Sequence, residues 1–174
     1  NPPTTAMHSK FIVPFTEMVA QRSGGKIKIE IYPALQLGGR PQQLLDQIRD
    51  GVVDIAWTLP GYTPGRLPQL DAFELPFVHK SVASSNKALV EFREKHLQEA
   101  SKEYKFLALH VHAGNVLITR DKPIRTLEDF KGLKLRTPNQ SGTWFLEATG
   151  ATPIGTTITE VAQLLSRGVI DGAA

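Results

Sequence analysis

Apolar and polar residues alternate with two different periods along the chain, and each period predicts a different element. Residues 26–32 (KIKIEIY) switch between charged and apolar side chains at every position, which is typical of a half-buried β-strand. Residues 8–22 carry apolar side chains at helical spacing instead. We expect a helix there, with Pro14 in its first turn or at a kink. The chain therefore mixes helices and strands.

One pattern occurs twice. Residues 44–57 (LLDQIRDGVVDIAW) and 161–174 (VAQLLSRGVIDGAA) each show an amphipathic helix, a glycine, two apolar residues and an aspartate. The copies align when Gly51 is placed on Gly168. A helix that ends at glycine and is followed at once by a short strand is an α/β building block. Two copies suggest an α/β protein with two similar lobes.

The rest of the sequence predicts further helices, strands and a loop that are consistent with an α/β protein. It predicts a long, constrained loop over 58–69 (TLPGYTPGRLPQ), in a position where open α/β sheets contact ligands. Capping-box spacing predicts the starts of two helices, at Thr126 with Asp129 and at Thr157 with Glu160. Besides the helix over 8–22 and the strand over 26–32, we expect helices over 41–50, 81–104, 126–130, 141–149 and 157–167, and strands over 52–57, 106–119 and 132–138.

Composition narrows the possible functions. The chain has 174 residues, a net charge of +3 and no cysteine, which excludes disulfides, thiolate metal sites and cysteine nucleophiles. Its basic residues are scattered among acidic ones, so we expect no nucleic-acid partner. No phosphate-binding glycine loop, serine elbow or HExxH motif is present. The sequence predicts no catalytic residue, no cofactor, no metal site and no enzyme activity.

Several segments, in their order, resemble the DctP-type solute receptors of TRAP transporters (tripartite ATP-independent periplasmic transporters). The matching segments are GGKIKIEIYPALQLGG, LLDQIRDGVVDIAWT, FELPFV, LEDFKGLKLRTPN and GATPIGTTITEVAQLLSRGVIDG, which together span most of the chain. The resemblance implies a two-lobed fold of the periplasmic-binding-protein type. We expect a first lobe over 1–113 and a second lobe over 114–174 that is incomplete at its end.

The resemblance also implies a function. A receptor of this kind captures a small organic acid in the periplasm, between its lobes, and delivers it to the membrane subunits of a TRAP permease. The expected protein is a monomer whose signal peptide has been removed. The alternatives are a ligand-sensing input module of a signalling system, which fused signalling sequence would favour, and an enzyme on the same scaffold, which turnover of the acid would support.

Arg136 is the principal binding candidate. It ends an alternating strand and precedes Thr-Pro-Asn, so its side chain lies where strand meets loop. A planar guanidinium binds a carboxylate in a two-pronged geometry that lysine cannot reproduce. In the family that this chain resembles, the arginine of the KLR segment binds the substrate carboxylate, and Arg136 matches it. The alternative is a solvated arginine at a strand end.

The resemblance places Trp57 and Thr58 on the cleft wall of the first lobe. Trp57 could stack on a planar ligand or fill the core. Sialic-acid receptors of the family carry an acidic residue and an arginine where this chain has Leu59 and Val116. These departures argue against sialic acid and favour a less polar carboxylate, with aromatic, hydroxy and keto acids as the alternatives.

Four further residues are weaker candidates for binding the ligand. His112 and Asn115 flank the expected crossing between lobes, while Asn139 and Thr157 fall at cleft-lining positions of the family. For Asn139 the alternative is a turn residue, and for Thr157 a helix N-cap, which is the better reading. His110 and His112 share one side of a strand, but zinc needs a third ligand that the sequence does not supply.

Overall fold

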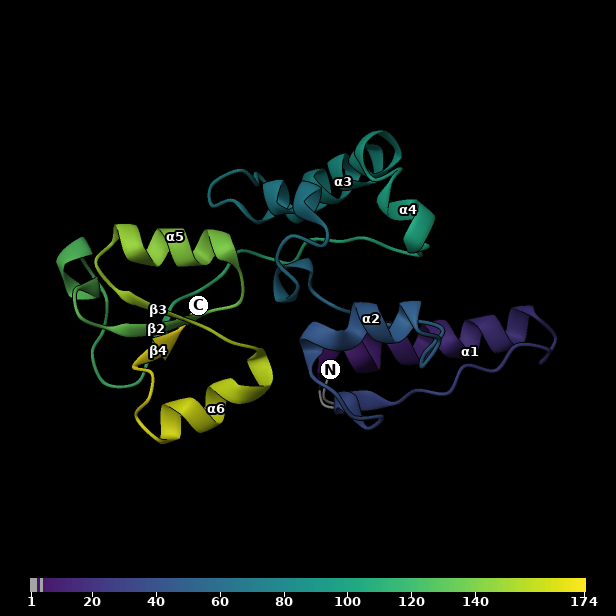
Figure 1. Ribbon diagram of the computed structural model, residues 1–174, viewed down its shortest axis with the longest axis horizontal. Coiled ribbons are helices and arrows are strands. Elements are labelled where there is room, and N and C mark those ends of the chain that lie inside the picture. Colours follow the sequence, from purple (N-terminus) through teal and green to yellow (C-terminus); the bar gives the residue numbers. More distant parts are fainter. Residues whose placement is uncertain (1–2, 4) are drawn as a thin grey trace. The chain divides into compact units, whose positions relative to one another are not determined.

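A small mixed sheet organises the C-terminal part of the chain (Figure 1). Its strands are β1 (Ile118–Thr119), β2 (Lys134–Thr137), β3 (Thr152–Gly155) and β4 (Gly172–Ala173), in the order β1-β4-β2-β3. Strand β2 pairs in parallel with β3 and β4, whereas β1 runs antiparallel to β4. Parallel neighbours need crossover connections, and helices provide them here. The predicted α/β class is confirmed.

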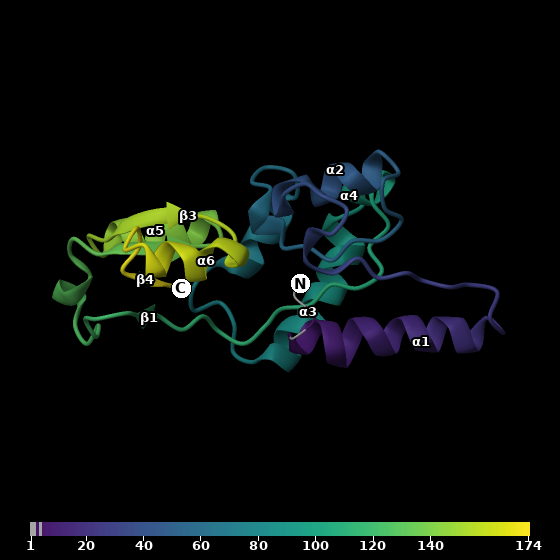
Figure 2. The same ribbon diagram turned by 90° about the horizontal axis from the view of Figure 1, so that it is seen from below.

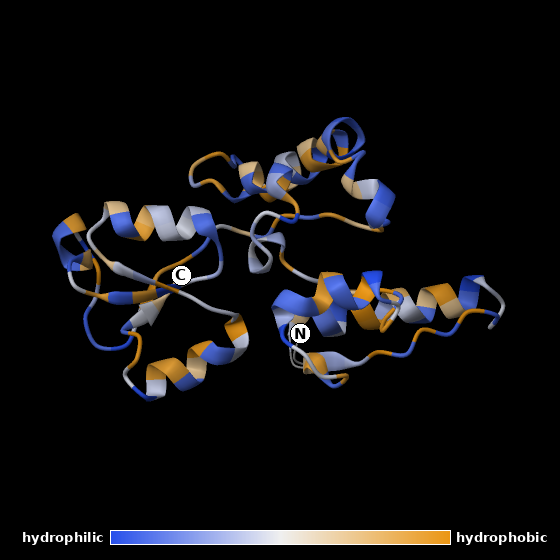
Figure 3. Cartoon of the chain, in the orientation of Figure 1, coloured by the Kyte–Doolittle hydropathy of each residue, from blue (hydrophilic) through white to orange (hydrophobic). Residues whose placement is uncertain are grey.

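Two helices cover this sheet from opposite sides (Figures 1 and 2). Helix α5 (Gln140–Ala148) connects β2 to β3, and α6 (Ile158–Ser166) connects β3 to β4. Figure 3 shows hydrophobic residues recurring along α6 between hydrophilic ones, as expected of a helix with one face on a sheet. The predicted helices over 141–149 and 157–167 are confirmed to within two residues.

The computed structural model describes residue 3 and residues 5–174, which divide into two units, 1–43 and 44–174. In the first unit, a π-helical turn (His8–Ile12) continues into α1 (Val13–Arg22). Pro14 follows the π-helical turn directly and lies within the continuous helical run, so its missing N–H falls at the point where the wider π turn interrupts α-helical bonding. Short 3-10 turns follow at Pro33–Leu35 and Pro41–Gln43.

The second unit begins with helical segments that precede the sheet. They are α2 (Leu44–Arg49), the 3-10 helices Pro60–Tyr62 and Pro68–Glu74, α3 (Val82–His96) and α4 (Ala100–Glu103). The prediction of one helix over 81–104 was wrong. The chain leaves helical geometry at Leu97, whose side chain is fully buried, and it resumes a helix only at Ala100. Burial of one large apolar side chain here outweighs the continuation of the helix.

Two hydrophobic clusters stabilise the second unit. One contains Leu45, Leu67, Leu70, Leu89, Leu97 and Tyr104, and the other contains Phe130, Leu135, Leu146 and Ala151. The first cluster comes from sequence before residue 113 and the second from sequence after it. The lobe boundary expected near residue 113 stays a prediction.

Among the described residues, no helix has the length and apolar character that crossing a bilayer requires.

Three predicted strands are missing or much shorter than expected. Residues 26–32 and 52–57 belong to no ladder, and within 106–119 only Ile118 and Thr119 form a strand. The alternation over 26–32 is still visible, since Ile29 and Ile31 are half-buried between exposed neighbours. A strand needs the hydrogen-bonding groups of a neighbour as well as an alternating pattern. No described segment supplies that neighbour.

Other differences concern proline-containing segments. Strand β3 was not predicted, because Pro153 and Gly155 disfavour a strand and leave only two strand formers in TPIG. It lies at the edge of the sheet, where Pro153 is tolerated. The loop predicted over 58–69 contains the 3-10 helix Pro60–Tyr62 and the start of another at Pro68. Both begin at proline, whose fixed φ suits a first helical position.

Candidate functional site

Arg136 is a buried cation in the middle of the sheet. It lies on β2 with only 4% of its surface exposed. Its Nε donates to the carbonyl oxygen of Thr156 at 2.8 Å, and its Nη1 donates to that of Ala174 at 3.0 Å. Burial lowers the pKa of the guanidinium, while Tyr62 and Glu160 act in the opposite direction. The alternative of a solvated arginine at a strand end does not fit this burial, which β2 shares over Leu135–Thr137 while Lys134 stays exposed.

Tyr62 reaches this guanidinium from far away in the sequence. It ends the 3-10 helix Pro60–Tyr62, and its hydroxyl oxygen accepts from the backbone N–H of Ile158 at 3.4 Å. A side-chain hydrogen bond between Tyr62 and Arg136 favours the charged guanidinium. The contact joins the loop after residue 58 to the start of α6. The loop over 58–69 was predicted to contact the ligand, but no pattern in its sequence pointed to Tyr62.

Thr157 is close to Arg136 but is occupied by a structural role. It is 2% exposed and is the N-cap of α6, in a capping box with Glu160. Its hydroxyl lies 3.1 Å from Oε2 of Glu160 and 2.8 Å from the hydroxyl of Thr159. These partners favour the N-cap reading of Thr157.

Asn139 is also a helix cap, and it adjoins a half-buried carboxylate. Its Oδ1 accepts from the backbone N–H of Gly142 at 2.9 Å, at the start of α5. Burial raises the pKa of Glu74, and the charge of Asp71 raises it further. The backbone of Gly61 and the side chain of Asn139 lower this pKa, because as hydrogen-bond donors they favour the ionised form. Sequence reasoning missed Glu74, which carries no motif of its own within FELPF.

Trp57 pairs with a histidine. Its Nε1–H donates to Nε2 of His110 at 3.0 Å, and the two rings stack at a centroid distance of 6.0 Å with 16° between their planes. The next residue, Thr58, has a buried hydroxyl oxygen without a hydrogen-bond partner in the described part of the chain. A buried hydroxyl usually finds a partner, so this oxygen is free to bind a water molecule or a ligand.

His112 and Asn115 are both exposed. Nδ1 of His112 contacts the carbonyl oxygen of Ala113, and the His112 charge acts weakly on Glu74. The structure thus brings Arg136 close to Thr157 and adds Tyr62 to them. No hydrogen bond, ion pair or ring contact joins Trp57 to Arg136 within the described residues.

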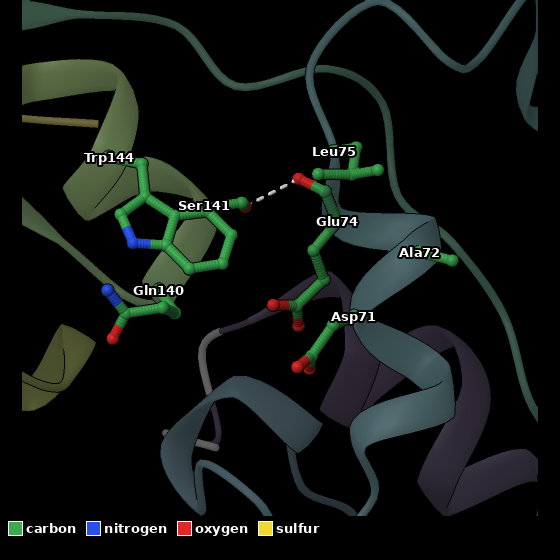
Figure 4. Close-up of a pocket in the computed structure, with 7 residues that line it drawn as sticks. All are labelled: Asp71, Ala72, Glu74, Leu75, Gln140, Ser141 and Trp144. Carbon is green, nitrogen blue, oxygen red and sulfur yellow. Dashed lines mark hydrogen bonds between the residues drawn. The ribbon is translucent and has the colours of Figure 1, made fainter. Parts of the chain in front are cut away.

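A small cleft of ≈ 120 Å³ lies between the 3-10 helix Pro68–Glu74 and helix α5 (Figure 4). It is lined by Asp71, Ala72, Glu74, Leu75, Gln140, Ser141 and Trp144. The hydroxyl of Ser141, on α5, donates to the backbone carbonyl of Glu74 at 2.7 Å and so joins the two elements that line the cleft. Within the described part of the chain, no group of three or more His, Cys, Asp or Glu side chains could hold a metal ion.

The arrangement around Arg136 is suited to binding an anion. The guanidinium contacts the backbone oxygens of Thr156 and Ala174 and the side chain of Tyr62, and its five N–H donors exceed what these contacts use. No ion pair of Arg136 with a carboxylate within 4.0 Å occurs among the described residues. A buried cation without a close counter-ion is costly, and an incoming carboxylate would compensate that cost.

Comparison with known proteins identifies the family. The whole chain, residues 1–174, matches the model of the bacterial extracellular solute-binding protein family 7, DctP. The chain therefore belongs to this family. The family is one of solute-binding proteins, in agreement with the prediction that the chain is not an enzyme.

Solved structures of TRAP solute-binding proteins share the fold. One, from an unidentified marine microbe, is described as specific for aromatic acid ligands and was solved with metahydroxyphenylacetate; it is 48% identical, with a TM-score of 0.95, over 99% of this chain and 54% of that chain. Another, from Rhodoferax ferrireducens, was solved with copurified benzoate and is 43% identical, with a TM-score of 0.94, over 98% of this chain and 53% of that chain.

A curated relative is the sialic acid-binding periplasmic protein SiaP of Vibrio cholerae. It is 30% identical over 159 residues, which are 90% of this chain and 49% of the relative. The chain spans about half the length of the curated relatives that it matches.

Proposed function

We propose that this chain contributes the carboxylate-binding part of a periplasmic receptor, which captures a small organic acid and delivers it to a TRAP membrane permease. Arg136 pairs with the carboxylate, and Tyr62 lies beside that contact. Closure around the ligand then completes the hydrogen bonds of the buried ion pair, as such a pair requires. Periplasmic relatives support the compartment, and the carboxylic acids bound by solved relatives support the ligand class.

One observation carries the proposal. Arg136 is buried to 4% exposure, its guanidinium contacts the backbone oxygens of Thr156 and Ala174 and the Tyr62 side chain, and it has no ion pair within 4.0 Å in the described part of the chain. A structural arginine at this depth would be expected to pair with a carboxylate of its own protein. Its position on a central strand is consistent with a side chain that binds the carboxylate of an incoming ligand.

We further propose that the acid is aromatic. Relatives at 48% and 43% identity were solved with metahydroxyphenylacetate and benzoate. In this chain, the Trp57 and His110 rings form a stacked pair that could extend over a planar ligand, and Thr58 carries an unpartnered hydroxyl next to it. Asn139, Asn115, His112 and Thr157 stay weaker candidates, since caps or exposure explain their positions.

Titration calorimetry on the full-length protein tests this function. The ligands are benzoate, metahydroxyphenylacetate and the non-aromatic keto acid pyruvate, and the two aromatic acids should bind more tightly. Each hydrogen bond to a charged group contributes about 1.5–3 kcal/mol. Losing two of them in Arg136→Ala should weaken binding of the aromatic acids at least about a hundredfold.

Two further variants make the test specific. Arg136→Lys keeps the charge but loses the planar two-pronged donor, so its affinity should fall between those of the wild type and Arg136→Ala. The exposed Arg125 serves as the matched control, and Arg125→Ala should bind like the wild type. If Arg136→Ala and Arg125→Ala bind equally tightly, Arg136 does not hold the carboxylate and the proposal is wrong.

A further inference from the structure

The Pro60–Tyr62 turn, which carries Tyr62, is tightly packed against the start of α5. A Cβ atom built on Gly61 would lie 2.7 Å from Cβ of Asn139 and 3.1 Å from each carboxylate oxygen of Glu74. Both distances are shorter than ordinary van der Waals contacts, so the backbone of Gly61 approaches these side chains as only glycine can. Tyr62 is the next residue, and its position therefore depends on this packing.

Glu74 lies at the centre of this contact. Its carboxylate oxygens lie directly against the Gly61 backbone, and the Gly61 N–H and the Asn139 side chain favour its ionised form, which lowers its pKa against the effect of burial. Its own carbonyl oxygen accepts from Ser141 at 2.7 Å, which fixes the end of the 3-10 helix Pro68–Glu74 against α5 (Figure 4). A negative charge near the first turn of α5 also interacts favourably with the helix dipole.

We propose that Glu74 is a positioning residue for the anion site: its carboxylate holds the Pro60–Tyr62 turn against the start of α5, and so places the Tyr62 hydroxyl beside the Arg136 guanidinium. This inference rests on the proposed function, since it concerns the same site. Glu74 touches neither the ligand carboxylate nor Arg136 in this role. It acts through the backbone of Gly61 and through Tyr62.

The ionised form of Glu74 is the one that performs this role, because only a carboxylate accepts from both donors without offering a competing proton. Asp71, on the same 3-10 helix, and His112, on the segment before residue 113, are the titratable groups that act on Glu74. The affinity of the wild type should therefore fall when the pH is lowered through the pKa of Glu74, which burial raises.

Stability should respond with the opposite sign. A carboxyl whose pKa is higher in the folded than in the unfolded protein favours folding at low pH, and this contribution is lost as the pH rises through the folded value. Neutral glutamine at position 74 removes the burial of a charge. Glu74→Gln should thus keep or increase the free energy of unfolding at neutral pH while it weakens ligand binding. A purely structural residue would lower both.

The test is a double-mutant cycle on the full-length protein, with benzoate binding measured by calorimetry. Glu74→Gln should weaken binding about tenfold at pH 8, and Tyr62→Phe should weaken it by a similar factor. In the Tyr62→Phe background, Glu74→Gln should add less than about twofold, because it acts through the missing hydroxyl. The exposed Glu91 on α3 provides the matched control, and Glu91→Gln should bind like the wild type.

Three results would overturn the inference: equal affinities of Glu74→Gln and Glu91→Gln, fully multiplicative effects in the cycle, or the same pH profile in the wild type and Glu74→Gln. The last comparison isolates Glu74, since any contribution of His112 persists in both proteins. Arg136→Ala is measured in parallel. If Arg136→Ala loses binding while Glu74→Gln does not, only this inference fails; if Arg136→Ala also binds normally, the proposed function fails.

Discussion

The two copies of the repeated pattern have the same helix end but different surroundings. In the first copy, the Gly51 N–H donates to Ile48 at 3.2 Å and the Val52 N–H donates to Gln47 at 2.9 Å. In the second copy, the Gly168 N–H donates to Leu165 at 3.1 Å and the Val169 N–H to Leu164 at 2.9 Å. Both glycines have positive φ, at 71° and 67°. Each helix therefore ends in the same Schellman geometry.

The copies diverge directly after the glycine. Ile170 is fully buried and leads into β4, and Asp171 exchanges backbone and side-chain hydrogen bonds with Lys134 on the neighbouring strand. In the first copy, Val53 is half-buried and Asp54 is exposed, in a segment that belongs to no ladder. Local sequence thus determines the helix end, whereas the role of the next residues depends on whether another strand lies beside them.

The largest expected difference between the copies concerns their apolar positions. Ile170→Ala should lower the free energy of unfolding by about 3 kcal/mol, because it leaves a cavity beside a fully buried position. Val53→Ala, at the equivalent half-buried position, should cost about 1 kcal/mol or less. Urea denaturation followed by circular dichroism measures both. Val52 and Val169, which are 56% and 44% exposed, are the matched controls. A loss of about 3 kcal/mol in Val53→Ala would show that 52–57 is as buried as β4.

Replacing the aspartate should also lower the free energy of unfolding more in the second copy than in the first, but by a smaller amount than for the apolar positions. Oδ2 of Asp171 accepts from the Lys134 N–H at 2.8 Å, and the Asp171 N–H donates back to the Lys134 carbonyl at 2.8 Å. Asp171→Ala should reduce the free energy of unfolding by about 1–2 kcal/mol, at the lower part of the range for charged partners because the bond is exposed. Asp54→Ala should change it by less than about 0.5 kcal/mol.

Thermal and urea unfolding of both aspartate variants check this prediction. Asp171→Asn is the second control, because its amide oxygen still accepts from Lys134 and should recover part of the loss. Equal effects of Asp54→Ala and Asp171→Ala would contradict the difference between the copies. Neither variant should alter benzoate binding strongly, since each aspartate lies after the glycine of its own copy and is not among the proposed binding residues.

Features set by neighbouring residues in the sequence were predictable. The capping boxes at Thr126 and Thr157 are both present, and helices end before Gly51 and Gly168 as expected. Strand pairing was not predictable in the same way. Residues 26–32 show the period of a strand without its partner, while β3 pairs with β2 despite Pro153. A ladder depends on residues far away in the chain, which no local period reports.

The candidate site likewise contains residues that the local sequence indicates and residues that only distant contacts reveal. Arg136 could be proposed from its strand, its neighbours and the family resemblance, and its burial supports the choice. Tyr62 and Glu74 could not be, because the roles proposed for them depend on interactions with Arg136 and with Asn139 on distant elements. The loop over 58–69 was recognised only as constrained and ligand-facing. The buried hydroxyl of Thr58, which has no hydrogen-bond partner in the described part of the chain, could be identified only from the structure.

The smallest expected difference concerns the two glycines themselves. Gly51→Ala and Gly168→Ala should each cost about 1 kcal/mol of unfolding free energy, since alanine is strained at positive φ. A Cβ at Gly51 would have no atom within 4 Å, and one at Gly168 would meet only Nη1 of Arg120 at an ordinary 3.7 Å. Both losses therefore reflect backbone strain alone, and urea denaturation should find them equal within about 0.5 kcal/mol. A much larger loss in Gly168→Ala would mean that the sheet beside it also constrains the helix end, so the copies would differ before the glycine as well as after it.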